Sequence, residues 1–502
     1  MTPLFQTGFG MVSARVGRGR SGGDEKRFFI NQFQRWSHFP IWAVMVLLAS
    51  TAGVAQAAGV KPGARQTGLR MEARPAERIS IDRVRAPQNP VATSTNLPAV
   101  VKNTLYLPKV RNQLLANCGA YAPSYYYKTY QEAREHGWIH PDVDVNPERV
   151  MSPGFTFPLT NGGENDGASI SYVMYIICRY GIASWKDMPE SYAYTDYPNE
   201  AQFRAAMPYR GLQVSAINIS TTNGIQSLKA HLAGGDLAVA GVKIYHDVYD
   251  YYPYGTGTDN GVICQRGTVK WDGHAFTIIG YDDTRVYTDD AGVKTGAFLA
   301  VNSWGPEWGV VEPTVGTGGF CWFGYDYLRC RAGGEAFGDN APAEICIMTD
   351  RTNYVPTDVA VLDLYHPSAA YLNVFLKPGS LADTNQTWLE VFPNGGSLLG
   401  FNGKIAADIT DFVAARGWSY WLKFDELQEP QMVSGILRGF EVQLDNSNVV
   451  LAAAASSLPY TISNGTISVL SAGLFPAMPM GGYSNGLDNA SAAWADFDRD
   501  GD

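Results

Sequence analysis

The sequence places a thiol, an imidazole and two carboxamides in an order that suits acyl transfer. Cys118 begins a predicted helix in "QLLANCGAYA", His274 opens the apolar run "HAFTIIGYDD", and Asn302 lies near the end of "AFLAVNSWG". A thiolate attacks a carbonyl carbon, an imidazole takes up and returns the proton, and an amide orients that imidazole. Gln113, five residues before Cys118, adds a donor for the oxyanion. These four residues are the predicted catalytic side chains.

The elements that must position these side chains follow from the pattern around them. Tyrosine, alanine and threonine recur three and four residues apart from about Asn117 to His136, which predicts a helix that ends at Gly137. A thiol at the N-terminus of a helix has a lowered pKa, because the helix dipole and the free N–H groups favour the thiolate. A second helix is predicted over Ser169–Tyr180, and after residue 235 the alternating β-branched pattern predicts strands.

Each candidate residue also has a purely structural interpretation. Free cysteines are usually buried and inert, and His274 would then be a satisfied core histidine. Asn302 would cap a turn before Trp304, and Gly167 in "NDG" would be an ordinary turn glycine rather than a backbone that pairs with an extended substrate. The occurrence of the flanking motifs in one order favours the catalytic interpretation of Cys118, His274 and Asn302.

Several motifs together resemble the papain family of cysteine peptidases over about Leu97–Leu328. They are "LPKVRNQ" with "CGAYA", "GASISYVMYIICRYGI", "DGHAFTIIGYDD", "VNSWGPEWG" and "GGFCWFGYDYL". The resemblance implies an α+β fold with two lobes, one helical and one β-barrel-like. It also assigns the roles of nucleophile, base, orienting residue and oxyanion donor to Cys118, His274, Asn302 and Gln113.

The same resemblance implies residues that contact the substrate or shield the site, namely Gly167, Gly273, Ala275 and Trp304. Trp304 would keep water from the His–Asn hydrogen bond, which strengthens that bond in a lower local dielectric. Two positions depart from the family pattern. Gln113 lies one residue closer to the nucleophile than is usual, and Gly119 stands where the family has a tryptophan.

The N-terminus resembles an export signal with a long basic region. Six arginine and lysine side chains precede an apolar run from Phe39 to Val54, and Ala55-Gln56-Ala57 then offers a cleavage site. This pattern predicts a signal peptide over residues 1–57, with an uncleaved membrane anchor as the alternative. Residues 58–96 have no helical or strand period and are predicted to be a linker or a short pro-segment. We therefore expect a secreted, periplasmic or cell-surface protein that meets the membrane only through this signal.

The C-terminal part has a different sequence pattern, made of short strand-like segments. Strand-like pieces such as "VAVLDLYH", "AYLNVFLKP", "TWLEVFP", "YWLKFDEL" and "LRGFEVQLD" alternate with turn residues, which predicts an antiparallel β-sandwich over 355–472. It loosely resembles the P-domain-like modules of bacterial secreted peptidases, which stabilise or target more often than they catalyse. A flexible tail, 473–502, ends in "DFDRDGD", where Asp496, Asp498 and Asp500 resemble part of a calcium loop. A solvated acidic tail is the alternative.

Composition limits the classes of partner. The formal net charge is -10, and no basic patch stands out after residue 112, which argues against nucleic acid. No cysteine or histidine pair has zinc spacing, so we expect catalysis without a cofactor. The substrate is expected to be a peptide or protein, and the oligomeric state is left open.

The sequence thus predicts an exported cysteine peptidase, with its peptidase domain over 97–350. Two alternatives stay open: a non-catalytic papain-fold adhesion or binding protein, and a transglutaminase-like acyl transferase. The shortened spacing from Gln113 to Cys118 is compatible with the first, and "NSWG" argues against the second.

Overall fold

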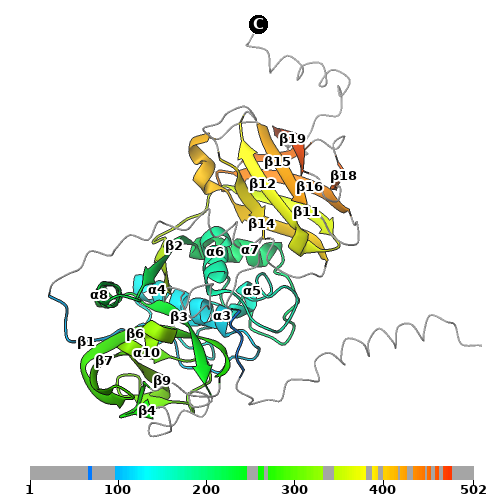
Figure 1. Cartoon of the computed structure of the whole chain (residues 1–502). Helices are drawn as coiled ribbons and strands as arrows, with labels where there is room; N and C mark the ends of the chain where they lie inside the picture. The colour runs from blue at the N-terminus through cyan, green and yellow to red at the C-terminus, as the bar shows by residue number, and fades with distance from the viewer. Residues whose placement is uncertain are drawn as a thin grey trace, which may run out of the picture. The chain divides into compact units, whose positions relative to one another are not determined.

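The structure of the chain is a computed structural model (Figure 1). It describes residues 66–70, 96–245, 258–264, 270–331, 344–379, 387–393, 400–415, 419–426, 434–446, 449–453, 458–462 and 467–476. The chain divides into two compact units, Met1–Pro62 and Gly63–Asp502, and every element below belongs to the second. Within the described residues, no helix has the length and apolar character needed to cross a membrane.

The helix that begins at Cys118 is continuous but changes its winding. It runs through α3 (Cys118–Tyr121), the π-helical segment η1 (Ala122–Lys128) and α4 (Thr129–His136), and ends at Gly137 with φ 69°. The predicted helix is confirmed. Pro123 lies at the start of the wider segment, where it lacks the N–H that an α-helix would need for its bond to the preceding turn.

Two further helices, α5 (Pro153–Thr156) and α6 (Ile170–Tyr180), pack against that central helix, whereas α8 (Thr222–Ala233) and α10 (Tyr325–Arg331) pack on strands. The predicted second helix is confirmed as α6, with the Ser169 side chain accepting from Tyr172 N–H at its start and Gly181 at its end. The helices, in chain order, are η2 (Pro147–Arg149), α5 (Pro153–Thr156), α6 (Ile170–Tyr180), α7 (Glu200–Ala206), η3 (Met207–Tyr209), α8 (Thr222–Ala233) and α10 (Tyr325–Arg331).

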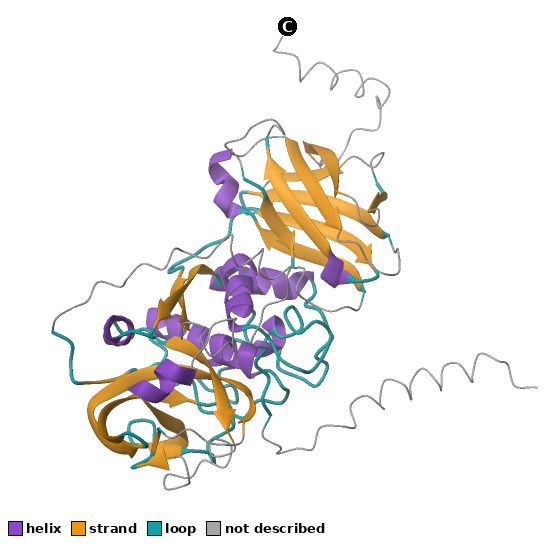
Figure 2. Ribbon diagram, viewed as in Figure 1, coloured by secondary structure: helices purple, strands orange, loops and turns teal. Residues whose placement is uncertain are grey.

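A ten-stranded sheet forms the second lobe of the N-terminal half of this unit, the half that contains Cys118, His274 and Asn302 (Figure 2). Its main path is β2-β10-β3-β6-β7-β9-β5-β4, with β1 on β6 and β8 on β9. The strands are β1 (Val100–Lys102), β2 (Gly211–Asn218), β3 (Ala238–Tyr245), β4 (Thr258–Asp259), β5 (Val262–Ile263), β6 (Lys270–Asp289), β7 (Gly292–Val301), β8 (Val310–Glu312), β9 (Thr317–Gly324) and β10 (Glu344–Asp350). The strands predicted after residue 235 are confirmed as β3, β6 and β7.

Strand β6 separates two hydrophobic cores. Ala275 and Ile279 join the core that contains the helix of Cys118, whereas Phe276 and Ile278 join a core inside the sheet lobe. Successive side chains of a strand point to opposite faces, so one strand serves both cores. The result is the predicted two-lobed α+β arrangement, with the helix of Cys118 against the strand of His274.

The C-terminal part is antiparallel throughout its nine strands. Their order is β13-β12-β15-β19-β17-β16-β11-β14, with β18 on β16. Their bounds are β11 (Val359–His366), β12 (Leu372–Pro378), β13 (Leu389–Phe392), β14 (Phe401–Asp408), β15 (Ser419–Glu426), β16 (Gly435–Leu444), β17 (Val449–Ala453), β18 (Tyr460–Ile462) and β19 (Ile467–Pro476); η4 (Ala369–Tyr371) and η5 (Thr410–Ala415) are short 3-10 turns.

The two ends of that strand order come together. Phe392 of β13 and Phe401 of β14 lie with ring centroids 5.3 Å apart. Strand β19 pairs with β15 through Gly473 and with β17 from Leu474 onward, so the sheet turns back on itself at this strand. Buried side chains from strands on either side of β19, among them Leu376 of β12 and Val442 of β16, belong to one core. The region is therefore rich in antiparallel strands, as predicted, and its assignment as a β-sandwich domain stays a prediction.

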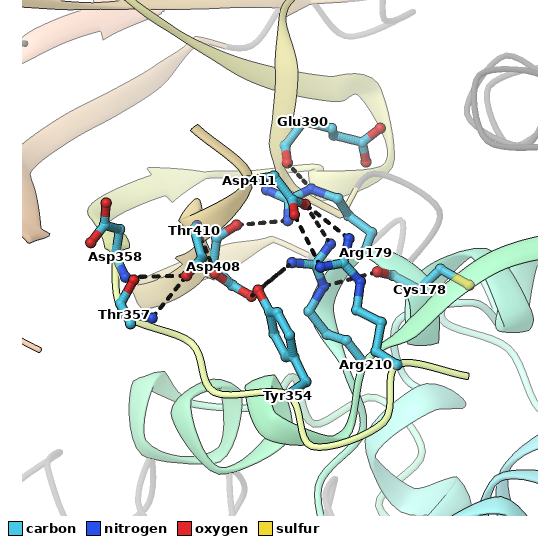
Figure 3. Close-up of polar contacts among 11 residues, drawn as sticks. Cys178, Arg179, Arg210, Tyr354, Thr357, Asp358, Glu390, Asp408, Thr410 and Asp411 are labelled. Carbon is cyan, nitrogen blue, oxygen red and sulfur yellow. Dashed lines mark hydrogen bonds and ion pairs between the residues drawn. The ribbon is translucent and has the colours of Figure 1, made fainter. Parts of the chain in front are cut away.

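A buried polar cluster joins the two halves of this unit (Figure 3). Arg210, just before β2, forms an ion pair with Asp408 at the end of β14 at 2.7 Å, and both side chains are almost fully buried. Arg179 of α6 donates to the backbone carbonyls of Glu390 and Asp408 at 2.5 and 2.9 Å. The Tyr175 hydroxyl donates to the Glu390 carboxylate at 2.7 Å.

Several predictions fall on other parts of the chain. The signal peptide over 1–57 and the candidate calcium ligands Asp496, Asp498 and Asp500 lie outside the described residues. Of the predicted linker 58–96 only its residues 66–70 and 96 are described, and β19 runs on to Pro476, beyond the predicted end of the sandwich at residue 472. The predicted domain boundaries therefore stay predictions.

Candidate active site

Cys118 is the first residue of α3 and is completely buried. The preceding Asn117 carbonyl accepts the N–H groups of Ala120 and Tyr121 at 2.8 and 2.7 Å, which starts the helix at this point. One turn further on, the Ala122 carbonyl accepts from Thr277 Oγ1 of β6 at 3.1 Å. This bond connects the helix of Cys118 to the strand that carries His274.

His274 and Asn302 are hydrogen bonded across two neighbouring strands. His274 Nε2 lies 2.7 Å from Asn302 Oδ1, and both residues are fully buried. The same Oδ1 accepts the N–H of Ser303 at 2.7 Å, which identifies this end of the amide as the acceptor. An acceptor oxygen requires that Nε2 carries the hydrogen, so in the neutral ring Nδ1 is the basic nitrogen.

The surroundings of His274 keep the ring neutral at rest. Burial lowers its pKa to about 4, although the hydrogen bond to Asn302 acts in the opposite direction. Trp304 stacks on the imidazole with ring centroids 4.3 Å apart, and Phe276 meets it edge-on at 4.8 Å. Within the described chain, His274 Nδ1 has no hydrogen-bond partner. The site thus holds a basic nitrogen that is ready to accept a proton.

Gln113 lies beside this pair. Its backbone N–H donates to the Ser303 carbonyl at 2.9 Å, and its side-chain Oε1 accepts from the Ser303 hydroxyl. The side-chain Nε2 donates one hydrogen to the Leu115 carbonyl at 2.7 Å. A carboxamide has two such hydrogens, so one is left for an oxyanion despite the shortened spacing to Cys118.

The four residues predicted to contact the substrate or shield the site lie on both lobes. Gly167 precedes α6 with φ 122°, a conformation that favours glycine. Gly273 and Ala275 flank His274 on β6, where they pair with Lys243 and Gly241 of β3. Trp304 stacks on the imidazole, and its predicted shielding of the His–Asn bond stays a prediction.

A short segment that the sequence did not single out crosses the same site. This segment, Gln66–Arg70, is called the 66–70 segment below. The Gln66 carbonyl accepts from Trp304 Nε1 at 2.7 Å, and the Gly68 carbonyl accepts from Gly119 N–H at 3.0 Å and from Ala168 N–H at 3.3 Å. Arg70 N–H donates to the Ala168 carbonyl at 3.1 Å, which makes a short parallel pairing.

Three glycines allow this close approach. A Cβ on Gly68 would lie 1.9 Å from the Ala116 carbonyl, and a Cβ on Gly119 would lie 2.1 Å from the Ala168 carbonyl. A Cβ on Gly167 would lie 2.9 Å from the Gly68 backbone. The structure thus explains why a tryptophan would not fit at position 119 in this chain. The sequence signal for the contact is weak, since Gly68 stands in an otherwise featureless basic stretch.

The comparison with protein families identifies the class of the site. Residues 158–312 match the sequence model of the papain family cysteine proteases. The match contains His274 and Asn302 and begins after Cys118, which the fold places against their strand. The chain therefore carries a papain-like cysteine peptidase domain, and the resemblance stated from its motifs is confirmed. No curated protein matches the chain.

Solved structures with this fold are distant in sequence. Xylellain, a cysteine protease from Xylella fastidiosa, is 17% identical over 58% of this chain and 99% of its own, with a TM-score of 0.41. The cysteine protease and lectin-like domains of Cwp84, a surface layer associated protein of Clostridium difficile, are 11% identical over 86% and 96%, with a TM-score of 0.37. Digestive procathepsin L 3 of Tenebrio molitor is 15% identical over 63% and 94%, with a TM-score of 0.35. At such TM-scores the family match is the informative comparison.

Proposed function

We propose that this protein is an exported peptidase in which Cys118 attacks the peptide carbonyl. The observation that carries the mechanism is the bond from His274 Nε2 to Asn302 Oδ1, because it leaves His274 Nδ1 as the base. The basic nitrogen takes the thiol proton and later returns it to the leaving amine. Water then attacks the acyl-enzyme; His274 takes a proton from the water and gives it to the departing Cys118 sulfur.

The oxyanion is held by Gln113 and by the backbone at the start of α3. The first N–H groups of a helix have no partner within it, so they point toward a developing negative charge. The Gly119 N–H is one of these, and the carbonyl that it binds in this structure is that of Gly68. The Gly68 carbonyl thus occupies a place in which the carbonyl of a bound peptide could receive the same N–H.

The 66–70 segment acts as the short pro-segment that the sequence allows for 58–96. It uses the Trp304 indole N–H, beside His274, and the Ala168 backbone, beside Gly119. While the segment is bound, an extended peptide cannot use those same groups. Export of the chain is supported by the N-terminal pattern alone, namely a basic stretch, an apolar run and Ala55-Gln56-Ala57.

The mechanism is tested by labelling Cys118 with a thiol-directed epoxide and by profiling cleavage with a peptide library. We expect labelling and cleavage in the wild-type chain, loss of both in Cys118→Ser, and loss of labelling in His274→Ala. Cys178→Ser is the matched control, because burial raises the pKa of the Cys178 thiol to about 12 and leaves it unreactive. If the wild-type chain neither cleaves peptides nor is labelled at neutral pH, even after the 66–70 segment is removed, the proposed mechanism is wrong.

The two alternatives give different outcomes in the same assay. A papain-fold binding protein would retain peptides without cleaving them, and Cys118→Ser would leave that binding unchanged. A transglutaminase-like enzyme would form a thioester and transfer the acyl group to an added amine in preference to water. The class of the family match favours hydrolysis.

A further inference from the structure

Glu190 is a buried carboxyl group directly beside the turn that leads to the nucleophile. It lies in the loop between α6 and α7 and is only 7% exposed. Its Oε1 accepts the backbone N–H of Leu114 at 3.2 Å and the side-chain Nδ2 of Asn117 at 2.7 Å. One oxygen therefore holds both ends of the Leu114–Asn117 turn.

That turn connects the two parts of the proposed oxyanion site. Leu114 follows Gln113 and Asn117 precedes Cys118. The Asn117 carbonyl accepts the N–H groups of Ala120 and Tyr121, so the place of Asn117 determines where α3 begins. A shift of the Asn117 side chain would move the start of α3, and with it the thiol, relative to the Gln113 amide.

The loop that carries Glu190 is itself firmly seated. Trp185 N–H donates to the Val150 carbonyl at 2.7 Å, and Met188 N–H donates to the Ser184 carbonyl at 3.0 Å. The backbone of Pro189 and Glu190 also passes close to Gly154 of α5, where a Cβ would meet it at 2.8 to 3.0 Å. Glu190 is thus held firmly where it contacts the turn. The middle of the turn has two further bonds, from Gln113 Nε2 to the Leu115 carbonyl at 2.7 Å and from Ala116 N–H to Asn165 Oδ1 at 2.8 Å, so Glu190 is what binds its two ends.

The Glu190 carboxylate and the Asn117 side chain together have more hydrogen-bond acceptors than there are donors to fill them when Glu190 is ionised. Glu190 Oε2 and Asn117 Oδ1 are both buried and, among the described residues, have no donor. Burial raises the pKa of Glu190 to about 7, although the bonds from Asn117 and Leu114 and the charge of Arg111 act in the opposite direction. Tyr121 also faces the carboxyl group, and its own pKa is raised.

We propose that Glu190 is a positioning residue for catalysis, which fixes the Leu114–Asn117 turn and thereby aligns the Cys118 thiol with the Gln113 amide. The proposal rests on the proposed function, because it assumes that Cys118 is the nucleophile. It gives the carboxyl group a role that its burial and its unpaired oxygen leave without explanation.

The test compares Glu190→Ala and Glu190→Gln in the full chain. The alanine variant removes the acceptor, and we expect its kcat and its rate of Cys118 alkylation to fall about tenfold or more, since misplacement by 1 Å costs on the order of 100-fold. The glutamine variant keeps an acceptor oxygen and adds a donor, so its rates should remain near those of the wild type. The wild-type alkylation profile should show a step near pH 7 that the glutamine variant lacks.

Glu132→Gln is the matched control. Glu132 is also a buried carboxyl group with a raised pKa, but it pairs with Lys128 at 2.5 Å, away from the turn. This variant should be less stable and yet alkylate at the wild-type rate while folded. If Glu190→Ala is folded and retains the wild-type kcat, alkylation rate and pH step, the positioning role is wrong. If Glu190→Ala does not fold, Asn117→Ala replaces it, with the same expected loss and the same contrary result. A wild-type chain without activity would instead overturn the proposed function.

Discussion

His274 Nε2 and Asn302 Oδ1 lie 2.7 Å apart, with no exposed surface on either residue. Trp304 stacks on the imidazole with ring centroids 4.3 Å apart. A hydrogen bond in a low dielectric is electrostatically stronger than one in water. The pair therefore fixes the orientation of the ring and leaves Nδ1 as the unprotonated nitrogen of the neutral imidazole.

We expect Asn302→Ala to lower kcat by about 10- to 100-fold, less than His274→Ala, which removes the base and should cost on the order of 100- to 10,000-fold. The alanine leaves the ring free to rotate and frees Nε2 from its acceptor. Since Asn302 acts to raise the pKa of His274, its loss should lower that pKa further. The measurement is the pH profile of kcat/KM with a fluorogenic peptide. An unchanged profile with unchanged kcat would show that the amide does not orient the base.

The low pKa of His274 should also make the stability of the fold depend on pH. In the unfolded chain the imidazole titrates near 6.5, and in the folded chain near 4. As the pH falls from 6.5 toward 4 the unfolded state binds the proton first, so stability is lost over this window, by on the order of 3 kcal/mol. His274→Gln should flatten that part of the curve in denaturant unfolding. A curve as steep as that of the wild type would assign the acid sensitivity to other groups.

The 66–70 segment should leave the site when Gly68 is replaced. A Cβ at Gly68 would lie 1.9 Å from the Ala116 backbone, which cannot move without shifting the nucleophile turn. We therefore expect Gly68→Ala to increase the rate of Cys118 alkylation about tenfold in the full chain. Gln66→Ala is the control, because Trp304 binds the backbone carbonyl of residue 66 and not its side chain. Equal rates in the wild type and in Gly68→Ala would mean that the segment does not limit access.

The buried pair of Arg210 and Asp408 should contribute strongly to stability. Although burial acts to raise it, the pKa of Asp408 is held below its ordinary value by Arg210 and by hydrogen bonds. Asp408→Ala removes the buried partner of Arg210 and leaves only the partly exposed Asp411, at 3.1 Å, to pair with its charge, so we expect a loss of about 3 kcal/mol. Asp363→Ala breaks an exposed pair with Arg438 in the same β region and should cost about 1 kcal/mol or less. The free energy of unfolding in denaturant measures both. Equal losses would contradict the role of burial.

Local patterns explain why much of the fold could be predicted. The helix that starts at Cys118 and α6 both follow from their apolar spacing and from the glycine that ends each of them. The strand "VAVLDLYH" corresponds to β11 residue for residue. His274 and Asn302 could be found because each lies in a distinctive motif. Their pairing follows from β6 and β7 being neighbours in one sheet.

Long-range contacts could not be predicted in the same way. Glu190 stands in "DMPE", which has no pattern of its own, and it gains its place only when the chain returns to Asn117. Arg210 and Asp408 are far apart in the chain and meet only after both halves of the unit have formed. The widening of the helix after Pro123 likewise depends on what packs around it, not on the tyrosine spacing.

At Gly119, helix propensity and the space around the residue favour different side chains. Alanine is a better helix former than glycine by about 1 kcal/mol, so propensity alone favours Gly119→Ala at the second residue of α3. The Cβ would, however, lie 2.1 Å from the Ala168 carbonyl and 3.1 Å from that of Gly68. We expect this variant to lose stability and to release the 66–70 segment together, because its helix N–H could no longer reach the Gly68 carbonyl. Gly403→Ala, where a Cβ meets only the Phe401 ring at 3.9 Å, is the matched control and should be neutral in thermal unfolding. A gain in stability for Gly119→Ala would show that the Ala168 backbone can move away from the helix.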